Sequence, residues 1–257
     1  MTGRAEPKTR EPNRRRKRRA RTRGLRAAPG STLAGTRDAL TAPVEDYLKA
    51  IYDIERGGDA AATNDIAQRL DIAPASVSGM VRRLAAQGLL AYERYRGVRL
   101  TPAGRRAALR TIRRHRVIEA YLVHALGFAW DSVHAEAERL EHAASDGLID
   151  RMAVAIGEPL TDPHGAPIPT REGRVDEGTH RTLAEVAIGG RARLVRVSDE
   201  DPALLRYLSS LGLRPDVVVR VRDRAPYDGP ITLDVAGRRL QVGAGLAAGL
   251  QVEPLAR

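Results

Sequence analysis

The stretch between Thr63 and Gly88 constrains the fold most, because it places two short helices on either side of a three-residue turn. Apolar residues recur at helical spacing on both sides of that turn: Ile66, Ala67 and Leu70 before it, and Val77, Met80, Val81 and Leu84 after it. The Thr63 hydroxyl can cap the first helix, Pro74 suits the first position of the second, and Gly88 ends it. The pattern therefore predicts a helix-turn-helix.

The second of these helices carries a polar face opposite its apolar stripe. The residues on this face are Ser76, Ser78, Gly79, Arg82 and Arg83. Small hydrogen-bonding groups let a helix lie close in the major groove of DNA, and the two arginines can contact phosphates. DNA recognition by this helix is the prediction, and core packing within an ordinary helical module is the alternative.

A β-hairpin is predicted directly after the helix-turn-helix. Residues 89–93 and 98–100 form its strands around an arginine-rich turn, and Thr101-Pro102 then begins a further helix. A hairpin in this place makes the unit a winged helix, with Arg94 and Arg96 placed to contact the DNA backbone. Because one such unit covers little DNA, we expect a homodimer bound to a palindromic operator in double-stranded DNA.

The positive charge of the chain is concentrated at its start. Between Met1 and Arg26, 12 Arg or Lys residues stand against two Glu residues, and most of the overall net charge of +11 therefore lies there. With almost no apolar residues, this segment cannot bury enough surface to fold. We expect residues 1–40 to be a disordered basic tail and linker, either a solvated arm or a nonspecific phosphate-binding segment.

The remaining chain divides into a multi-domain α+β protein. We predict a winged-helix DNA-binding domain over 41–104, a helical dimerisation domain over 105–158, a Pro/Gly-rich linker over 159–180, and an SH3-like barrel over 181–257. The β-like segments of the last domain are Leu183–Val197, Val217–Arg222, Ile231–Val235, Arg239–Val242 and Leu250–Val252, with one helix at 202–208.

The chain contains no cysteine, which excludes disulfides, iron–sulfur clusters, thiolate zinc sites and cysteine nucleophiles. Any metal must therefore be bound by carboxylates and imidazoles. No apolar run of about 18 residues could span a bilayer, and the Arg-rich start lacks the apolar stretch of a secretory signal. We expect a cytoplasmic protein with no membrane partner.

Residue types that bind metals gather in the helical domain. One set is His134, Glu138, Glu141 and His142, at positions i, i+4, i+7 and i+8 of one helix face; the other is His115 and Glu119, at i and i+4. Salt bridges with neighbouring arginines are the alternative for the second set taken alone. The two sets together favour metal binding.

Motifs along the whole chain carry a resemblance to a known family. They are Glu45-Asp46-Tyr47-Leu48, the helix-turn-helix, the wing from Tyr95 to Gly104, Arg114-His115-Arg116, His134, Glu141-His142 and the run from Pro163 to Pro169. Over residues 41–257 the chain resembles the diphtheria-toxin-repressor family of iron- and manganese-dependent regulators. The resemblance implies a metal-dependent repressor of metal-homeostasis genes, with a FeoA-like SH3 domain at its C-terminal end.

The resemblance also implies two metal sites. The primary site, which controls DNA binding, consists of Asp46, Glu138, Glu141 and His142. The ancillary site consists of His115, Glu119 and His134, with Asp201 or Glu200 as a further ligand from the SH3-like domain. An amide-bearing ligand of the iron-type members corresponds to Leu204 here and is not matched.

The donor set favours manganese. Iron-type members have Met and Cys where this chain has Asp46 and Glu138, whereas manganese-type members have Asp and Glu. Manganese binds most weakly in the divalent series, so a manganese site must supply several hard, anionic oxygens. We expect Mn(2+) as the corepressor, with Fe(2+) as the alternative because a further acidic ligand of some manganese sensors falls at Lys49.

The switch follows from where these ligands lie. Asp46 belongs to the winged helix and the other primary ligands to the dimerisation helices, so a shared ion fixes the spacing of the two recognition helices. A winged-helix regulator of a small organic ligand is a second hypothesis. A di-iron oxidase is a third, but such enzymes use Glu-x-x-His pairs, whereas His142 follows Glu141 directly. We therefore expect no enzyme activity.

Overall fold

The computed structural model describes residues 2–3, 40–93 and 96–256, and the following description is confined to them. Most of the expected basic tail, together with the wing residues Arg94 and Tyr95, lies outside the described residues. Among the described helices, none combines the length and the apolarity needed to cross a lipid bilayer.

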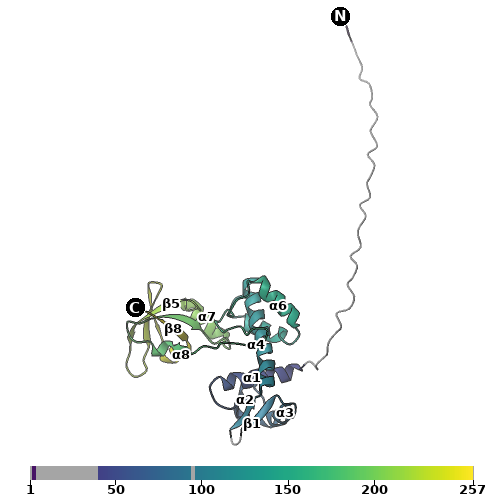
Figure 1. Cartoon of the computed structure of the whole chain (residues 1–257). Coiled ribbons are helices and arrows are strands. Elements are labelled where there is room, and N and C mark those ends of the chain that lie inside the picture. Colours follow the sequence, from purple (N-terminus) through teal and green to yellow (C-terminus); the bar gives the residue numbers. More distant parts are fainter. Residues whose placement is uncertain (1, 4–39, 94–95, 257) are drawn as a thin grey trace. The chain divides into compact units, whose positions relative to one another are not determined.

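The first folded part is a winged helix, as predicted. It contains α1 (Ala42–Glu55), α2 (Thr63–Arg69), α3 (Pro74–Ala86) and an antiparallel hairpin of β1 (Leu90–Glu93) and β2 (Gly97–Leu100) (Figure 1). Pro74 is the first residue of α3, but the capping role expected for Thr63 is wrong. Thr63 is already helical, and the N-cap residue Ala62 makes no side-chain capping bond.

The wing is pinned to the loop after α1 by backbone pairing. Val98 exchanges two backbone hydrogen bonds with Ala61, at 2.9 and 3.0 Å. Gly97 lies so close to Ala61 that an added Cβ would be 2.1 Å from the Ala61 carbonyl oxygen, and its φ is +125°. Only glycine fits this close approach without displacing the hairpin.

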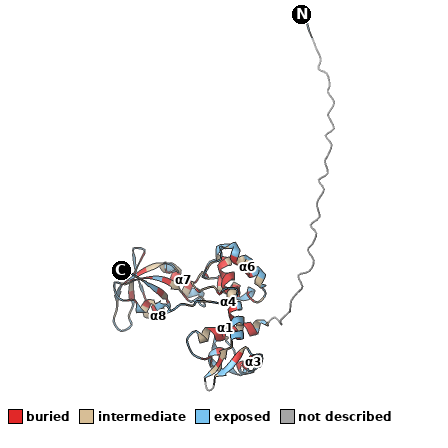
Figure 2. Cartoon of the chain, viewed as in Figure 1, coloured by how far each residue is buried: buried red, intermediate tan, exposed pale blue. Residues whose placement is uncertain are grey.

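Helix α4 (Pro102–His124) runs through two hydrophobic cores. Its N-terminal half contributes Leu109 and Ile112 to the core of the winged helix, beside residues of α1, α2 and α3. Its C-terminal half contributes Val117 and Ile118 to a second core, formed with α5 (Val133–Leu140) and α6 (Asp146–Ala155). Figure 2 shows buried residues along α4. A side chain near the middle of α4 can therefore reach groups of both parts.

The segment 159–180 contains no helix and no strand of a sheet, yet parts of it are buried. Asp162 and His164 have relative exposures of 4% and 1%. Arg113 donates to the Pro169 carbonyl at 2.9 Å, and Arg116 donates to the Pro167 carbonyl. The segment is thus held against α4 by arginine side chains.

The last part is a six-stranded antiparallel sheet with the order β3-β8-β4-β5-β6-β7. Its strands are β3 (Arg181–Thr182), β4 (Arg191–Arg196), β5 (Val218–Arg224), β6 (Ile231–Val235), β7 (Arg238–Val242) and β8 (Gln251–Leu255). Its helices are α7 (Pro202–Leu211) and α8 (Ala244–Gly249). The single strand expected over Leu183–Val197 is wrong, because residues 183–185 form a 3-10 turn before β4 begins. Helix α8, which is built from Gly, Ala and Leu, was not expected.

Candidate metal centre

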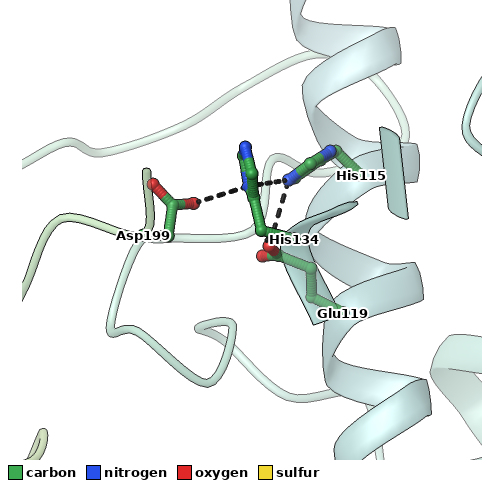
Figure 3. A group of neighbouring side chains, drawn as sticks. All are labelled: His115, Glu119, His134 and Asp199. Carbon is green, nitrogen blue, oxygen red and sulfur yellow. Dashed lines mark hydrogen bonds and ion pairs between the residues drawn. The ribbon is translucent and has the colours of Figure 1, made fainter. Parts of the chain in front are cut away.

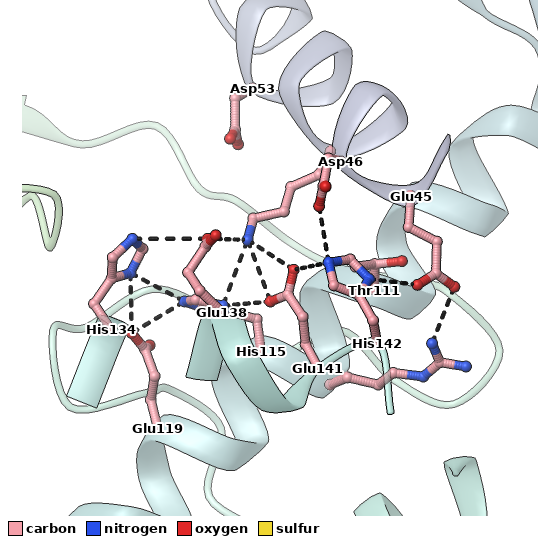
Figure 4. Close-up of polar contacts among 12 residues, drawn as sticks. Glu45, Asp46, Asp53, Thr111, His115, Glu119, His134, Glu138, Glu141 and His142 are labelled. Carbon is pink, nitrogen blue, oxygen red and sulfur yellow. Dashed lines mark hydrogen bonds and ion pairs between the residues drawn. The ribbon is translucent and has the colours of Figure 1, made fainter. Parts of the chain in front are cut away.

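The first group of candidate ligands joins α1 to the end of α5. The Asp46 carboxylate lies 2.9 Å from Nε2 of His142, and an oxygen of Glu141 lies 3.5 Å from the same nitrogen (Figure 4). Glu141 is the C-cap of α5, and its backbone is still helical at φ −60° and ψ −33°, so it keeps the helical face that its spacing predicts. Asp46, Glu141 and His142 can offer ligand atoms to one ion. We call them the switch group.

Glu138 does not join the switch group directly. Its carboxylate lies with His115 and Glu141 in a neighbouring group, and Glu141 is shared between the two groups. The cause is Lys49, one turn along α1 from Asp46, whose ammonium donates a hydrogen bond to Glu138 at 2.6 Å. The four residues expected as one primary site are therefore adjacent in the structure but divided by an ion pair.

His142 is oriented by a carboxylate that sequence reasoning missed as a site residue. Its Nδ1 lies 2.7 Å from Glu45, and Arg114 in turn donates to Glu45 at 3.0 Å. This contact leaves Nε2 facing Asp46 and Glu141. A carboxylate behind a ligating histidine fixes the ring and its tautomer, as is common at metal centres. The signal was present in the sequence, since Glu45 directly precedes Asp46.

Burial and neighbouring charges shift the pKa values of Asp46 and His142. Burial raises the pKa of Asp46, with further increases from Glu141 and Glu138 that oppose the lowering by His142 and Lys49. Burial lowers the pKa of His142, but the hydrogen bond to Glu45 and the charges of Asp46 and Glu141 raise it above its ordinary value. Proton and metal therefore compete for the same atoms.

The second group lies along α4 and combines all three residues expected at the ancillary site. His115 Nε2 lies 3.1 Å from both Glu119 and Nδ1 of His134, and His134 lies 3.5 Å from Asp199 (Figure 3). These four residues can offer ligand atoms to one ion. We call His115, Glu119, His134 and Asp199 the ancillary group.

The acid of the C-terminal part that lies in the ancillary group is Asp199, not Asp201 or Glu200, which the sequence suggested as ligands. Asp201 is the N-cap of α7, where its carboxylate accepts a hydrogen bond from the Ala203 amide at 2.8 Å. Glu200 pairs with Arg69 of α2. Asp199 is the acid that reaches His134. Periodicity cannot rank three consecutive acids in a loop, because their directions depend on the turn that precedes α7.

The surroundings of the two ancillary imidazoles favour their protonated forms, although the facing nitrogens, Nε2 of His115 and Nδ1 of His134, can share only one proton. Burial alone lowers the pKa of His115, but hydrogen bonds to Glu119 and Glu141 raise it to about 9. Burial acts in the same direction on His134, and Asp199 and Glu119 raise its pKa to about 10. A bound ion requires neutral imidazole, so this proton must leave when metal binds.

A buried trio extends the ancillary group. Glu119, Asp162 and His164 can each offer a ligand atom to one ion, and all three residues are buried. One polar atom of each residue has no hydrogen-bond partner among the described residues: Glu119 Oε2, Asp162 Oδ2 and His164 Nδ1. Unpaired buried polar atoms are costly, and three that converge fit the donor set of a divalent cation. His164 lies in the run from Pro163 to Pro169, which was a clue; Asp162 had none.

An open cavity of about 1010 Å³ lies beside these groups. Its lining includes Asp46, Lys49, His115, His134 and Asp199, together with arginines from several elements. The cavity gives solvent and ions a path to side chains that are otherwise half-buried.

The predicted DNA-contacting residues are exposed. Ser76, Ser78, Gly79, Arg82 and Arg83 of α3 and Arg96 of the wing all face solvent. The apolar residues Val77, Val81 and Leu84 of α3 are buried instead, so the division of α3 into two faces agrees with the pattern in the sequence.

Three family models match the chain in succession. The model for the N-terminal DNA binding domain of iron dependent repressors matches residues 39–98, and the model for their metal binding and dimerisation domain matches residues 101–170. The FeoA domain model matches residues 181–254.

Individual relatives cover most of the chain. It is 34% identical over 210 residues to the iron-dependent repressor IdeR of Mycobacterium tuberculosis, covering 77% of this chain and 90% of that protein. It is 30% identical over 226 residues to the diphtheria toxin repressor of Corynebacterium diphtheriae, covering 84% and 99%. A solved manganese-dependent transcriptional repressor in complex with manganese shares 38% identity at a TM-score of 0.75, covering 82% of this chain and 100% of that chain.

Proposed function

The chain belongs to the family of iron-dependent repressors, and we propose that it is a manganese-responsive member that represses genes of metal-ion homeostasis. Asp46, Glu138, Glu141 and His142 are the residues proposed to hold the controlling ion, and the ancillary group and the buried trio a second one. The α3 face with Ser76, Ser78, Gly79, Arg82 and Arg83, together with Arg96 of the wing, is proposed to contact DNA.

The observation that carries this proposal is the chemistry of the switch group. Asp46 and Glu141 supply carboxylate oxygens, Glu138 adds another nearby, and no sulfur donor exists anywhere in the chain except methionine. Hard oxygen donors with one imidazole suit manganese, which gains little from softer ligands. The family resemblance of the solved manganese-dependent repressor is consistent with this preference.

The coupling to DNA rests on which elements contribute the ligands. Asp46 is on α1 of the winged helix, whereas Glu141 and His142 follow α5 of the helical part. A divalent ion held by both would supply the positive charge that keeps these carboxylates together. An ion shifts the equilibrium toward the DNA-binding conformation only if it binds that conformation more tightly than the other. Ligands from two parts of the chain provide this difference in affinity, because they meet around one ion in only one conformation.

A homodimer on a palindromic operator is part of the proposal. Exposed apolar side chains on the helical part include Leu148 and Val154 of α6 and Leu160 just after it. Exposed apolar surface of this kind is typical of a face that pairs with a second subunit. Two winged helices, held at a fixed separation, read two half-sites about one helical turn apart.

The test is operator binding with and without metal. DNA selected by the manganese-loaded protein from a random library serves as the probe, and binding is measured with Mn(2+), Fe(2+), Zn(2+) or a chelator. We expect tight binding with Mn(2+) and loss of binding on chelation. Asp46→Ala and Glu138→Ala should lose the metal response, whereas Glu136→Gln, a partly exposed acid on the same helix as Glu138 that pairs with Arg139, should keep it.

Two outcomes would overturn the proposal. Equal operator binding with chelator and with manganese would show that metal does not control DNA binding. No stoichiometric uptake of manganese in equilibrium dialysis would instead favour a regulator that senses a small organic ligand in the cavity beside Lys49.

An iron(II)-responsive repressor of iron uptake is the second candidate. It is favoured by the iron-dependent relatives and by Lys49, which removes one anionic donor from the neighbourhood of the switch group. The comparison of Mn(2+) with Fe(2+) in the same assay separates the two candidates, because the activating ion supports binding at a lower free concentration.

A further inference from the structure

Lys49 places an ammonium group among candidate metal ligands. Its Nζ lies 2.6 Å from Glu138, 3.1 and 3.2 Å from the two carboxylate oxygens of Glu141, and 3.4 Å from Nδ1 of His115. Within the described residues, every polar partner of this ammonium belongs to the His115–Glu138–Glu141 group. The ammonium therefore makes the contacts that an ion bound by this group would make.

The ammonium forms ion pairs with two carboxylates in that place, at 2.6 Å from Glu138 and 3.1 Å from Glu141. Glu141 is completely buried, and a buried carboxylate needs a paired charge. Lys49 supplies that charge from α1, whereas Glu141 and Glu138 belong to α5 and its C-cap.

Glu141 belongs to both neighbouring groups. Its Oε1 lies 3.5 Å from Nε2 of His142 in the switch group, its Oε2 contacts Nδ1 of His115, and both oxygens contact the Lys49 ammonium. Glu141 therefore lies between two positions for a cation. One of the two cation positions is taken by the ammonium.

Charge balance points to the same division. With His115 and His142 neutral, as bound metal requires, Asp46, Glu138 and Glu141 carry three negative charges, and Lys49 reduces the sum to a value that one divalent ion neutralises. Glu45 does not alter this balance, because it is paired with Arg114. A second divalent ion next to the ammonium would leave an excess of positive charge in a half-buried site, which is costly.

We propose that Lys49 is a tethered cation that fills the position between His115, Glu138 and Glu141, so that the switch takes one divalent ion beside a fixed ammonium instead of a carboxylate-bridged pair of ions. This inference rests on the proposed function. It makes Lys49 the residue that sets the metal stoichiometry of the switch.

The experiment compares the full-length protein with Lys49→Glu, Lys49→Gln and Lys49→Arg. Bound manganese per chain is counted by equilibrium dialysis with elemental analysis, and electron paramagnetic resonance reports whether two ions share a carboxylate, because such ions couple magnetically. We expect Lys49→Glu to bind one more manganese per chain than the wild type and to acquire the spectrum of a coupled pair. Lys49→Arg, which keeps the cation, should match the wild type in both readouts.

Lys49→Gln is a second test of the inference in case Lys49→Glu does not fold. It removes the ammonium without adding a charge, so it should also gain an ion, with weaker affinity than Lys49→Glu. Circular dichroism of each variant checks folding. A coupled pair already present in the wild type would overturn the inference, because the ammonium would then have been displaced. So would a folded Lys49→Glu and a folded Lys49→Gln that both keep the wild-type stoichiometry. A wild type that binds no manganese at all would instead refute the proposed function.

Discussion

The switch group and the buried trio both consist of carboxylates and imidazoles, but these side chains are paired differently in the two regions. In and around the switch group every acid has a cationic partner: Lys49 for Glu138 and Glu141, His142 for Asp46, and Arg114 for Glu45. In the buried trio, Glu119, Asp162 and His164 each retain a polar atom without a hydrogen-bond partner among the described residues. Their nearest opposite charges lie farther away, at 3.8 Å from Arg116 to Asp162 and 3.7 Å from His164 to Glu119. One region is held by close ion pairs, and the other has only long ones.

This difference separates a switch from a structural site. A group whose acids are already paired can exist without metal, so two states of similar free energy are available to it. A buried group with unpaired polar atoms is destabilised without metal, so an ion there contributes to the stability of the fold. We therefore expect the switch group to govern DNA binding and the ancillary group with its trio to govern stability.

Separate substitutions in the switch group and in the ancillary group test this difference most directly. We expect Asp46→Asn to weaken manganese-dependent operator binding by about a hundredfold, the upper part of the range for allosteric coupling. Glu119→Gln should weaken it by about tenfold or less, because it acts through the rigidity of α4. Fluorescence anisotropy with labelled operator DNA measures both. A larger loss for Glu119→Gln than for Asp46→Asn would reverse the assignment of the two groups.

The pH dependence of manganese binding should also differ between the groups. Between pH 6 and pH 8, His115 and His134 share one extra proton in the metal-free protein, because both pKa values are raised but their facing nitrogens, 3.1 Å apart, cannot both be protonated. His164 of the trio, with a pKa raised to about 9, holds a second. Binding at the ancillary group and the trio must release both protons, so the affinity should rise about a hundredfold per pH unit and fall equally as the pH falls. The switch group contains one histidine, so its affinity should rise about tenfold per pH unit below the raised pKa of His142.

Titration calorimetry in buffers of different ionisation enthalpy measures these protons directly. Asp46→Asn leaves the ancillary group to be measured alone, and Glu119→Gln leaves the switch group. Equal proton release by the two variants would contradict the difference that the structure predicts.

The orienting role of Glu45 gives a smaller effect. Glu45→Gln keeps the shape of the side chain but removes the charge that faces Nδ1 of His142. Loss of such a partner behind a ligating histidine weakens metal binding by about tenfold or somewhat more. Manganese titration of the variant measures it, with Glu136→Gln as the matched control. Unchanged affinity would mean that His142 needs no support from Glu45.

The sequence predicted the DNA-binding part better than the metal centre, for a physical reason. Helix α3 and the hairpin are defined by local periodicity and by Pro74 and Gly97, so neighbours along the chain were sufficient. The metal centre depends on which of several acids points inward from a loop, and loops have no periodicity. Asp201 was therefore chosen where Asp199 lies in the group.

The least predictable features were a cation and a buried acid. Lys49 was recognised as a departure from an acidic ligand, but its sequence position does not show that its ammonium lies between Glu138 and Glu141. Asp162 lay in a Pro/Gly-rich segment interpreted as a linker, and its burial depends on arginines of α4 that hold the segment in place. Long-range contacts of this kind leave no local pattern.

The smallest expected effect tests the trio through stability alone. Burial raises the pKa of Asp162 to about 6, with Glu119 adding to the increase. The unfolded chain releases this proton near the ordinary pKa of 3.8, so the metal-free fold loses stability as the pH rises from about 4 to about 6 and stays less stable above that. Asp162→Asn removes this loss and still accepts the backbone hydrogen bonds of His164 and Ala166.

In chelator at pH 7.5 we therefore expect Asp162→Asn to be more stable than the wild type by about 1 kcal/mol, a rise of a few degrees in Tm. At pH 4.5 the difference should shrink, because the wild-type carboxyl is then protonated in the fold. Added manganese should reverse the order, since only the wild type offers a third anionic donor to the ion. A variant that is less stable than the wild type in chelator at pH 7.5 would mean that Asp162 is paired without an ion, and the contrast between the two regions would disappear.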